Sequence, residues 1–335
     1  MKLFGRDLDK DVCVVAEIGN NHEGSLTRAR ELVHAAKKAG VDAVKFQTFI
    51  TENFVSPLQT ERFKRLKSFE LSNEAFLELF ELAHSLGLGY FSSAFDLGSL
   101  DFIGRNAEAI KIASGDNNFY PLLNAAAAYG KPILMSTGMA TYSEIESAVE
   151  MIRQSTPKSS PLALIVLHCV SAYPAPDGEL NLRAIPILKD KLNVPVGFSD
   201  HSSGIMAATL ASALGACVIE KHFTLDKQLS SFRDHALSAD PKEMTDLVKN
   251  VRRVQTLIGS GAEGPQPSEK GIMREAHRSI CAARDLPQGH VLVNDDLIWL
   301  RPADGLSPGK ENLLVGRRLL RPIRRAHKIL ESDVG

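Results

Sequence analysis

The sequence has no excess of charge of either sign and no apolar run long enough to cross a membrane. Its 335 residues include 39 lysines and arginines against 40 aspartates and glutamates, which gives a formal net charge of −1. Proteins that bind nucleic acids or membrane surfaces need a concentration of positive charge, and this balance does not supply one. A membrane span needs roughly 18 apolar residues in a row, and the segment MKLFGRDLDKDV lacks the apolar stretch of a signal peptide. We therefore expect neither a nucleic-acid partner nor a membrane partner.

Cysteine is scarce, and several familiar enzyme motifs are missing. The four cysteines, Cys13, Cys169, Cys217 and Cys281, lie far apart and form no CxxC pair, which argues against a zinc cage or a disulfide framework. Three of them lie in apolar, strand-like segments, as expected for buried thiols in a reducing cytoplasm. The absence of HExxH, Walker A and GxSxG motifs argues against the common metalloproteases, P-loop NTPases and serine hydrolases.

What the sequence does contain is a regular alternation of short apolar segments and helix-like stretches. The predicted strands, rich in valine and isoleucine, are residues 12–18, 42–48, 88–93, 109–114, 131–137, 163–169, 194–200 and 216–222. Eight βα units in roughly 260 residues match the size of a (β/α)₈ TIM barrel. An open, doubly wound sheet is the alternative, but no predicted strand is followed by GxGxxG.

The alternation ends after Ile258. The stretch GSGAEGPQPSEKG that follows contains two prolines and four glycines and has no periodicity, which predicts a linker. We therefore predict a barrel domain at 1–262, a linker at 263–277 and a small β-rich domain at 278–335.

The small domain contains an internal repeat. The segment LPQGHVLVNDDL echoes IRRAHKILESDV, with His290 over His327, Leu292 over Ile329 and Asp296 over Asp333. An apolar pair followed by a short acidic turn, used twice, predicts a module with pseudo-symmetry. A module of this size is marginal alone, so we expect it to dock on something larger.

Polar and charged residues gather at the carboxyl ends of the predicted strands, where TIM barrels place their active sites. These residues are Glu17, Lys45, Gln47, Lys111, Ser114, Ser136, Ser199, His201, Glu220 and His222. Each has an ordinary explanation on its own: a lysine can pair with a carboxylate, a histidine can be a hydrogen-bonded core residue, and a serine can cap a helix. Together at one rim they would be costly for structure alone, so the pattern predicts a functional site.

The residue types at this rim suggest two kinds of ligand. Two lysines with nearby serine hydroxyls and glycine-flanked amides suit a phosphorylated, carboxylated anion. His201 and His222 end neighbouring strands, so their imidazoles can converge on one divalent metal and leave positions open for water and substrate.

Several motifs together resemble the sialic acid synthase family, which makes N-acetylneuraminate and related nonulosonic acids. They are VAEIGNNHEGSL, DAVKFQTF, KIASGDNNFYPLL, ILMSTGMA, LHCVSAYPAP, VGFSDHSSG and GACVIEKHFTLD, in this order. The tail, with VNDDLIWLRPADGLSP and ILESDV, resembles the family's C-terminal antifreeze-like (SAF) domain. The resemblance covers essentially the whole chain.

The resemblance implies a role for each matching residue. The implied catalytic residues are Glu17, Lys45 and Lys111, and the implied phosphoenolpyruvate ligands are Lys45, Ser93, Lys111, Ser114 and Ser136. The implied sugar ligands are Gln47, Ser171, Tyr173, Ser199, Asp234 and Arg301. The implied metal ligands are His201 and His222, with Mn²⁺ expected and Mg²⁺ or Co²⁺ as alternatives. Departures at Ser93, Ser171, the loop after the last barrel strand and residues 50–71 leave the sugar open.

The resemblance also implies a reaction and an assembly. Phosphoenolpyruvate would condense with an open-chain N-acetylated hexosamine, either N-acetylmannosamine or a 2,4-diacetamido-trideoxyhexose, to give a nonulosonic acid and phosphate. The alternatives are a Schiff-base aldolase that uses Lys45 or Lys111, and a non-catalytic sugar-binding relative. The family implies a domain-swapped homodimer in which Arg301 reaches the partner's barrel. The competing interpretation is that Arg301 only packs beside Trp299.

Overall fold

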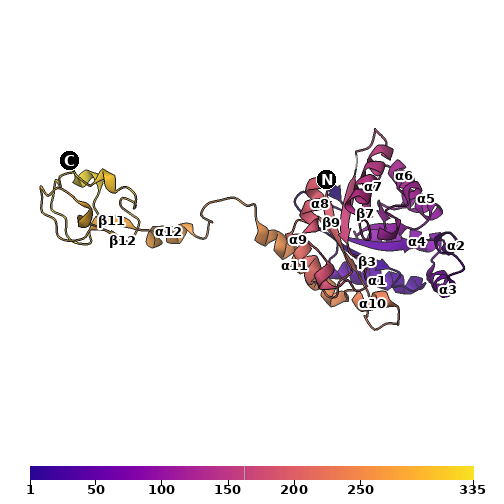
Figure 1. Cartoon of the computed structure of the whole chain (residues 1–335). Helices are drawn as coiled ribbons and strands as arrows, with labels where there is room; N and C mark the ends of the chain where they lie inside the picture. The colour runs from indigo at the N-terminus through magenta and orange to yellow at the C-terminus, as the bar shows by residue number, and fades with distance from the viewer. Residues whose placement is uncertain (162) are drawn as a thin grey trace. The chain divides into compact units, whose positions relative to one another are not determined.

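The computed structural model describes residues 1–161 and 163–335, which form two compact units, Met1–Gly259 and Ser260–Gly335 (Figure 1). Within the described residues, none of the helices combines the length and the apolar character needed to span a bilayer.

The first unit is a closed barrel of eight parallel strands, which confirms the predicted TIM barrel. The strands are β3 (Cys13–Gly19), β4 (Ala43–Thr48), β5 (Gly89–Ala94), β6 (Ala109–Ile112), β7 (Ile133–Ser136), β8 (Leu164–Cys169), β9 (Val196–Asp200) and β10 (Val218–His222). They follow each other around the barrel in chain order, and β10 pairs with β3 to close it.

A short hairpin precedes the barrel and was not predicted. It consists of β1 (Lys2–Leu3) and β2 (Arg6–Asp7). Its turn residue Phe4 stacks on Phe91 inside the barrel, with ring centroids 5.1 Å apart, and Leu3 belongs to the same interior cluster. The hairpin therefore covers the amino-terminal end of the barrel, so the opposite end is the one available to a ligand.

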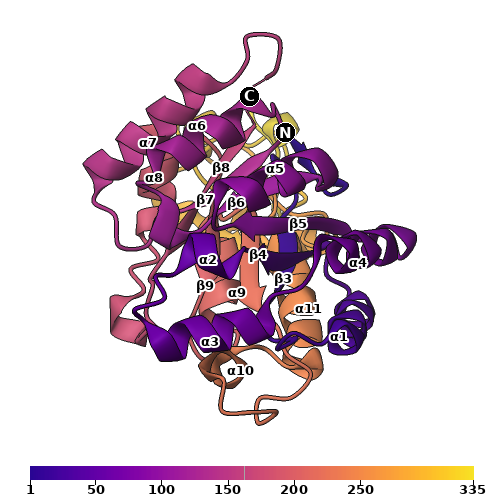
Figure 2. The ribbon, with the colours of Figure 1, turned by 90° about the vertical axis from the view of Figure 1, so that its right-hand side faces the viewer.

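Helices surround the barrel (Figure 2). They are α1 (Leu26–Ala39), α2 (Thr51–Phe54), α3 (Thr60–Phe69), α4 (Asn73–Ser85), α5 (Leu97–Asn106), α6 (Tyr120–Ala128), α7 (Tyr142–Ser155), α8 (Ala184–Leu192), α9 (Met206–Ala213), α10 (Arg233–Leu237) and α11 (Pro241–Ile258). Local signals set their ends: the Ser25 hydroxyl caps α1, and Gly40 ends it in the left-handed conformation. Capping boxes begin α7 at Thr141 and α11 at Asp240.

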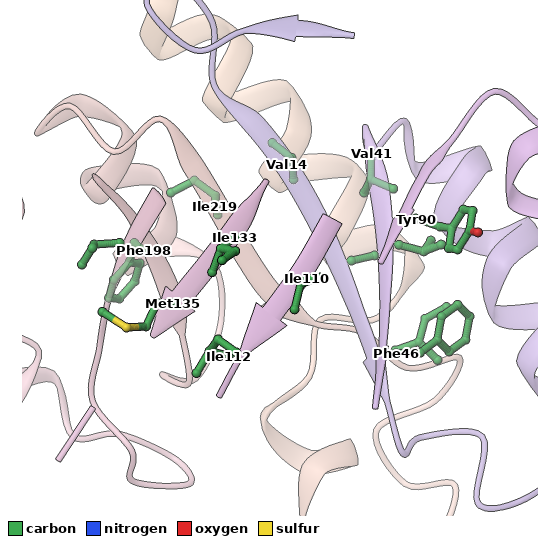
Figure 3. Packing of buried hydrophobic residues seen from close by; sticks show 14 of the residues in the cluster. Val14, Val41, Phe46, Tyr90, Ile110, Ile112, Ile133, Met135, Phe198 and Ile219 are labelled. Carbon is green, nitrogen blue, oxygen red and sulfur yellow. The ribbon is translucent and has the colours of Figure 1, made fainter. Parts of the chain in front are cut away.

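The barrel strands divide their side chains between two cores. Outward residues such as Val14, Phe46 and Ile110 pack against the helices (Figure 3). Inward residues such as Val15 and Phe91 fill the barrel interior. Successive strand residues point to opposite faces, so the residues two positions beyond these inward ones also point inward, at the carboxyl end. Those positions carry the polar residues of the candidate site.

The second unit contains α12 (Lys270–Ala276) and the antiparallel pair β11 (Ser279–Ala282) and β12 (Leu297–Leu300), with its own apolar core. Helix α12 lies inside the stretch that we predicted as an irregular linker. The predicted repeat is visible in two buried carboxylates: Asp296 accepts a hydrogen bond from Arg284 Nε at 2.9 Å, and Asp333 accepts one from Arg321 Nε at 2.6 Å.

Candidate active site

The polar residues at the carboxyl ends of the strands line one cavity of about 360 Å³. Every predicted site residue of the first unit lies on its wall: Glu17, Lys45, Gln47, Ser93, Lys111, Ser114, Ser136, Ser171, Tyr173, Ser199, His201, His222 and Asp234. Arg301 is the exception, because it follows β12 in the second unit, where its side chain is exposed. The cavity brings these residues together, and their individual roles stay predictions.

Two carboxylates share one lysine at the centre of the cavity. Lys45 Nζ lies 2.9 Å from Glu17 Oε1 and 3.5 Å from Glu220 Oε1, and all three side chains are buried. Burial opposes the charge on Lys45, but the two carboxylates outweigh it and raise its pKa. Burial raises the pKa of Glu17 to about 7, opposed by the Lys45 charge and assisted by Glu220. Glu17 is therefore the carboxyl group that can exchange a proton near neutral pH.

Lys111 lies among serine hydroxyls on the β6–β7 side of the cavity. Its Nζ donates hydrogen bonds to Ser136 Oγ at 2.6 Å and to the Ile112 carbonyl at 2.9 Å. Burial lowers the pKa of this lysine. The Ser171 hydroxyl is buried without a partner among the described residues. A buried ammonium and an unpartnered hydroxyl in the wall of one cavity form an environment that an anionic ligand would complete.

The two predicted metal ligands face each other across β9 and β10. The ring centroids of His201 and His222 lie 5.3 Å apart, and Tyr173 packs 4.3 Å from the His201 ring. His201 Nδ1 lies 3.0 Å from the Val170 carbonyl, which can only accept, so Nδ1 carries the proton and Nε2 is left with a free electron pair.

His222 is buried, and within the described structure its Nδ1 has no hydrogen-bond partner. Burial, followed by the charge on His201, lowers its pKa far below the ordinary value, so the ring is neutral at pH 7. Burial opposes a charge on His201, but Cys169 and the Val170 carbonyl outweigh it and raise its pKa. Once both imidazoles are neutral, their free electron pairs fit a divalent metal. In the part of the chain that the structure describes, no group of three His, Cys, Asp or Glu side chains could hold a metal ion. The remaining ligands would then be water and substrate, as in a catalytic site.

Comparison with known proteins agrees with this geometry. The sequence pattern of the NeuB family matches residues 32–263, and that of the SAF domain matches residues 277–335. The chain belongs to the NeuB family. Members of this family are phosphoenolpyruvate-dependent nonulosonic acid synthases and typically use a divalent metal, so this NeuB-family chain is an enzyme.

Three relatives show how far the similarity extends. The N,N'-diacetyllegionaminic acid synthase of Legionella pneumophila is 42% identical over 320 aligned positions, and the match covers 91% of this chain and 90% of that protein. The pseudaminic acid synthase of Campylobacter jejuni is 35% identical over 348 aligned positions, and the match covers 99% of each chain. The crystal structure of the N-acetylneuraminic acid synthetase of Leptospira borgpetersenii, in complex with citrate, is 38% identical with a TM-score of 0.73. It covers 78% of this chain and 90% of that one.

The NeuB-family site also contains residues that our sequence analysis did not assign to it. They are Asn20, Phe54, Arg62, Arg65, Leu66, Phe95, Ala113, Gly115, Met139, Phe232 and Arg233. Glu220, which the sequence analysis placed at this rim without a role, also lies on the wall, because it precedes His222 by two positions on one strand and points the same way. Arg62 and Arg65 had no local signal, since their place depends on how residues 50–71 cross the barrel mouth.

A buried ion pair supports the two histidines from outside the barrel. Lys221 Nζ lies 3.0 Å from Asp200 Oδ2, and both side chains are 0% exposed. Asp200 also accepts hydrogen bonds from the Ser202 amide at 2.8 Å and the Ser202 hydroxyl at 2.6 Å. Each member of the pair directly precedes a histidine, so the pair ties together the ends of β9 and β10 and fixes the backbone of His201 and His222.

Proposed function

We propose that this enzyme condenses phosphoenolpyruvate with an open-chain N-acetylated hexosamine to form a nonulosonic acid. The observation that carries the proposal is the convergence of Lys45, Lys111, Glu17, His201 and His222 on one cavity. The bond forms between C3 of phosphoenolpyruvate and the aldehyde carbon of the sugar. Water adds at C2, and phosphate leaves.

In this reaction the two lysines interact with the anionic substrate, phosphoenolpyruvate. Lys111, with Ser114 and Ser136, binds the phosphate and carboxylate oxygens, while Lys45 balances the charge that moves as the enol attacks. Glu17 holds or releases a proton at the water or at the aldehyde oxygen, because its pKa of about 7 allows either state at neutral pH. His201 and His222 would hold a divalent metal, Mn²⁺ on the family resemblance, which would supply Lewis-acid polarisation of the aldehyde oxygen.

The acceptor we favour is a 2,4-diacetamido-trideoxyhexose, with N-acetylmannosamine as the second candidate. The favoured sugar is supported by the 42% identity to a diacetyllegionaminic acid synthase. Gln47, Ser171, Tyr173, Ser199 and Asp234 are the residues that we assign to the sugar. We also infer that the enzyme is a cytoplasmic homodimer in which Arg301 completes the site of the partner chain.

The deciding assay is phosphate release from phosphoenolpyruvate with a panel of acetamido hexoses. The expected result is metal-dependent phosphate release with one acetamido hexose and little without a sugar. The competing chemistry, a Schiff-base aldolase, would use Lys111, since Lys45 is held charged by two carboxylates. Borohydride with pyruvate would then trap a covalent adduct, whereas the condensation forms no imine. Trapping without phosphate release would overturn the proposal.

A further inference from the structure

Helix α3 presents two arginines to the cavity. Arg62, Arg65 and Leu66 all line it, and the two arginines are three positions apart, so they are neighbours on one helical face. Both side chains are exposed at the mouth of the cavity.

Neither arginine is neutralised by the protein. Among the described residues, no carboxylate lies within ion-pair distance of Arg62 or Arg65, and Arg62 only donates to Gln59 Oε1 at 3.3 Å. The lysines on the rest of the helix are paired: Lys64 with Glu61 at 3.7 Å, and Lys67 with Glu52 and Glu70 at 3.1 Å. The helix therefore neutralises its outer lysines and leaves its cavity face positive.

Two other cations of the cavity wall have carboxylate partners, and the buried Lys111 donates to Ser136 and to the Ile112 carbonyl. Lys45 lies between Glu17 and Glu220, and Arg233 lies 3.3 Å from Asp234. Two like charges at this spacing destabilise a helix, so unpaired arginines facing a cavity have no structural advantage.

The position of α3 is fixed by packing at its carboxyl end. Phe69 makes an edge-to-face contact with Phe232, with ring centroids 5.1 Å apart, and Glu70 accepts a hydrogen bond from the Thr51 amide at 2.9 Å. Figure 2 shows α3 between α2 and α10. The guanidinium of Arg62 also lies over the Phe54 ring, 5.6 Å from its centroid. The two arginines are thus held at the cavity mouth on a supported helix.

We propose that Arg62 and Arg65 form an outer anion subsite that binds a phosphate or carboxylate group of a substrate. Guanidinium groups bind such anions with paired N–H donors, and among residues 1–161 and 163–335 no carboxylate forms an ion pair with Arg62 or Arg65. The inference rests on the proposed function. Two sources can supply the anion: phosphoenolpyruvate as it enters the cavity, or the phosphate of a phosphorylated hexosamine, if the acceptor is such a sugar instead of the uncharged 2,4-diacetamido-trideoxyhexose favoured above.

The test compares the double variant Arg62→Ala, Arg65→Ala with the control Lys64→Ala, which removes a cation of the same helix that does not line the cavity. The KM and kcat/KM are measured for phosphoenolpyruvate, the 2,4-diacetamido-trideoxyhexose, N-acetylmannosamine and N-acetylmannosamine 6-phosphate. We expect the double variant to lose at least about tenfold in kcat/KM for one anionic substrate, the size expected for charge-assisted hydrogen bonds. The variant Arg62→Lys, Arg65→Lys should recover part of the loss, because it keeps the charge.

The arms of the experiment distinguish the two sources. A loss confined to the sugar phosphate assigns the subsite to the acceptor, and a loss confined to phosphoenolpyruvate assigns it to that substrate. Calorimetric titration measures the binding of both anions even where no turnover occurs. A failure of the proposed function can therefore be distinguished from the absence of the subsite. If the double variant binds both anions as tightly as Lys64→Ala does, the subsite does not exist.

Discussion

At the centre of the cavity, two carboxylates share a single lysine. Lys45 is the one lysine within ion-pair distance of both Glu17 and Glu220 in the described structure, and all three side chains are buried. Because two buried carboxylates compete for one ammonium group, one of them is held close to protonation. Glu220 is also stabilised by the Lys111 charge and the Ser199 hydroxyl, so the group held close to protonation is Glu17. A carboxyl group suited to proton transfer is thus produced by crowding, at a cost in stability.

This cost predicts how stability depends on pH. The folded-state pKa of Glu17 is about 7 against an ordinary value of 4.5, so the folded state binds more protons than the unfolded state between these values. Stability therefore falls as pH rises through this window. Glu17→Gln should remove this dependence and be more stable than the wild type at pH 8 by about 1–3 kcal/mol. Urea unfolding of the metal-free protein at pH 5 and pH 8 measures both effects.

The control for this experiment is Glu81→Gln, since Glu81 is exposed on α4. It should keep the wild-type dependence of stability on pH. An equal slope for Glu17→Gln and the wild type would show that Glu17 ionises normally in the folded protein.

The histidine pair predicts a metal requirement. Chelation should abolish turnover, and Mn²⁺ should restore it, because the two imidazoles fit one divalent ion. His222→Ala should fold but lose most of its Mn²⁺ affinity in calorimetric titration, whereas His34→Ala, an exposed change on α1, should bind as the wild type does. Full activity of a chelated His222→Ala enzyme would show that this pair does not hold the metal.

At the scale of elements, the barrel strands were predictable from the sequence. The path of residues 50–71, which cross the barrel mouth, was not. Residues two apart on one strand share a face, so Lys45 and Gln47 could be placed together from the sequence alone. The capped helices α7 and α11 carry equally local signals. Helix α3 and the hairpin β1–β2 depend on contacts such as Phe69 with Phe232 and Phe4 with Phe91, which join residues far apart in the sequence. No local pattern encodes such contacts.

The link between β9 and β10 gives a prediction at the same scale. Asp200→Asn leaves the Lys221 ammonium without its counter-charge in the protein interior, which should cost about 3–5 kcal/mol of unfolding free energy. The double variant Asp200→Asn, Lys221→Met should recover much of this loss. Both variants should bind Mn²⁺ more weakly, because the pair positions the backbone of His201 and His222.

The exposed pair of Glu150 and Arg153 on α7 supplies the matched control. Glu150→Gln should change stability little, since an exposed pair is screened by water. Chemical denaturation and metal titration of the variants check both parts. If Asp200→Asn is destabilised but binds the metal as tightly as the wild type, the pair of Asp200 and Lys221 stabilises the fold and does not position the metal site.

At the scale of the whole molecule, the chain consists of two units with separate apolar cores. The cavity lies in the first unit, whereas Arg301 follows β12 in the second. Trp299 donates its indole hydrogen bond to Glu311 at 2.7 Å, and for Arg301 the described structure gives neither a hydrogen bond nor an ion pair. The second unit thus offers an exposed arginine that its own fold does not use.

The proposed domain-swapped dimer predicts complementation between inactive variants. Arg301→Ala and Glu17→Ala should each be nearly inactive as homodimers, because one lacks the arginine and the other the carboxyl group. In a mixed dimer with exchanged domains, the barrel that keeps Glu17 receives an intact Arg301 from its partner. Subunit exchange should therefore restore phosphate release to about half of the wild-type rate or less, since only one of two sites is complete. If verified heterodimers of the two inactive variants stay inactive, Arg301 does not act on the partner's site.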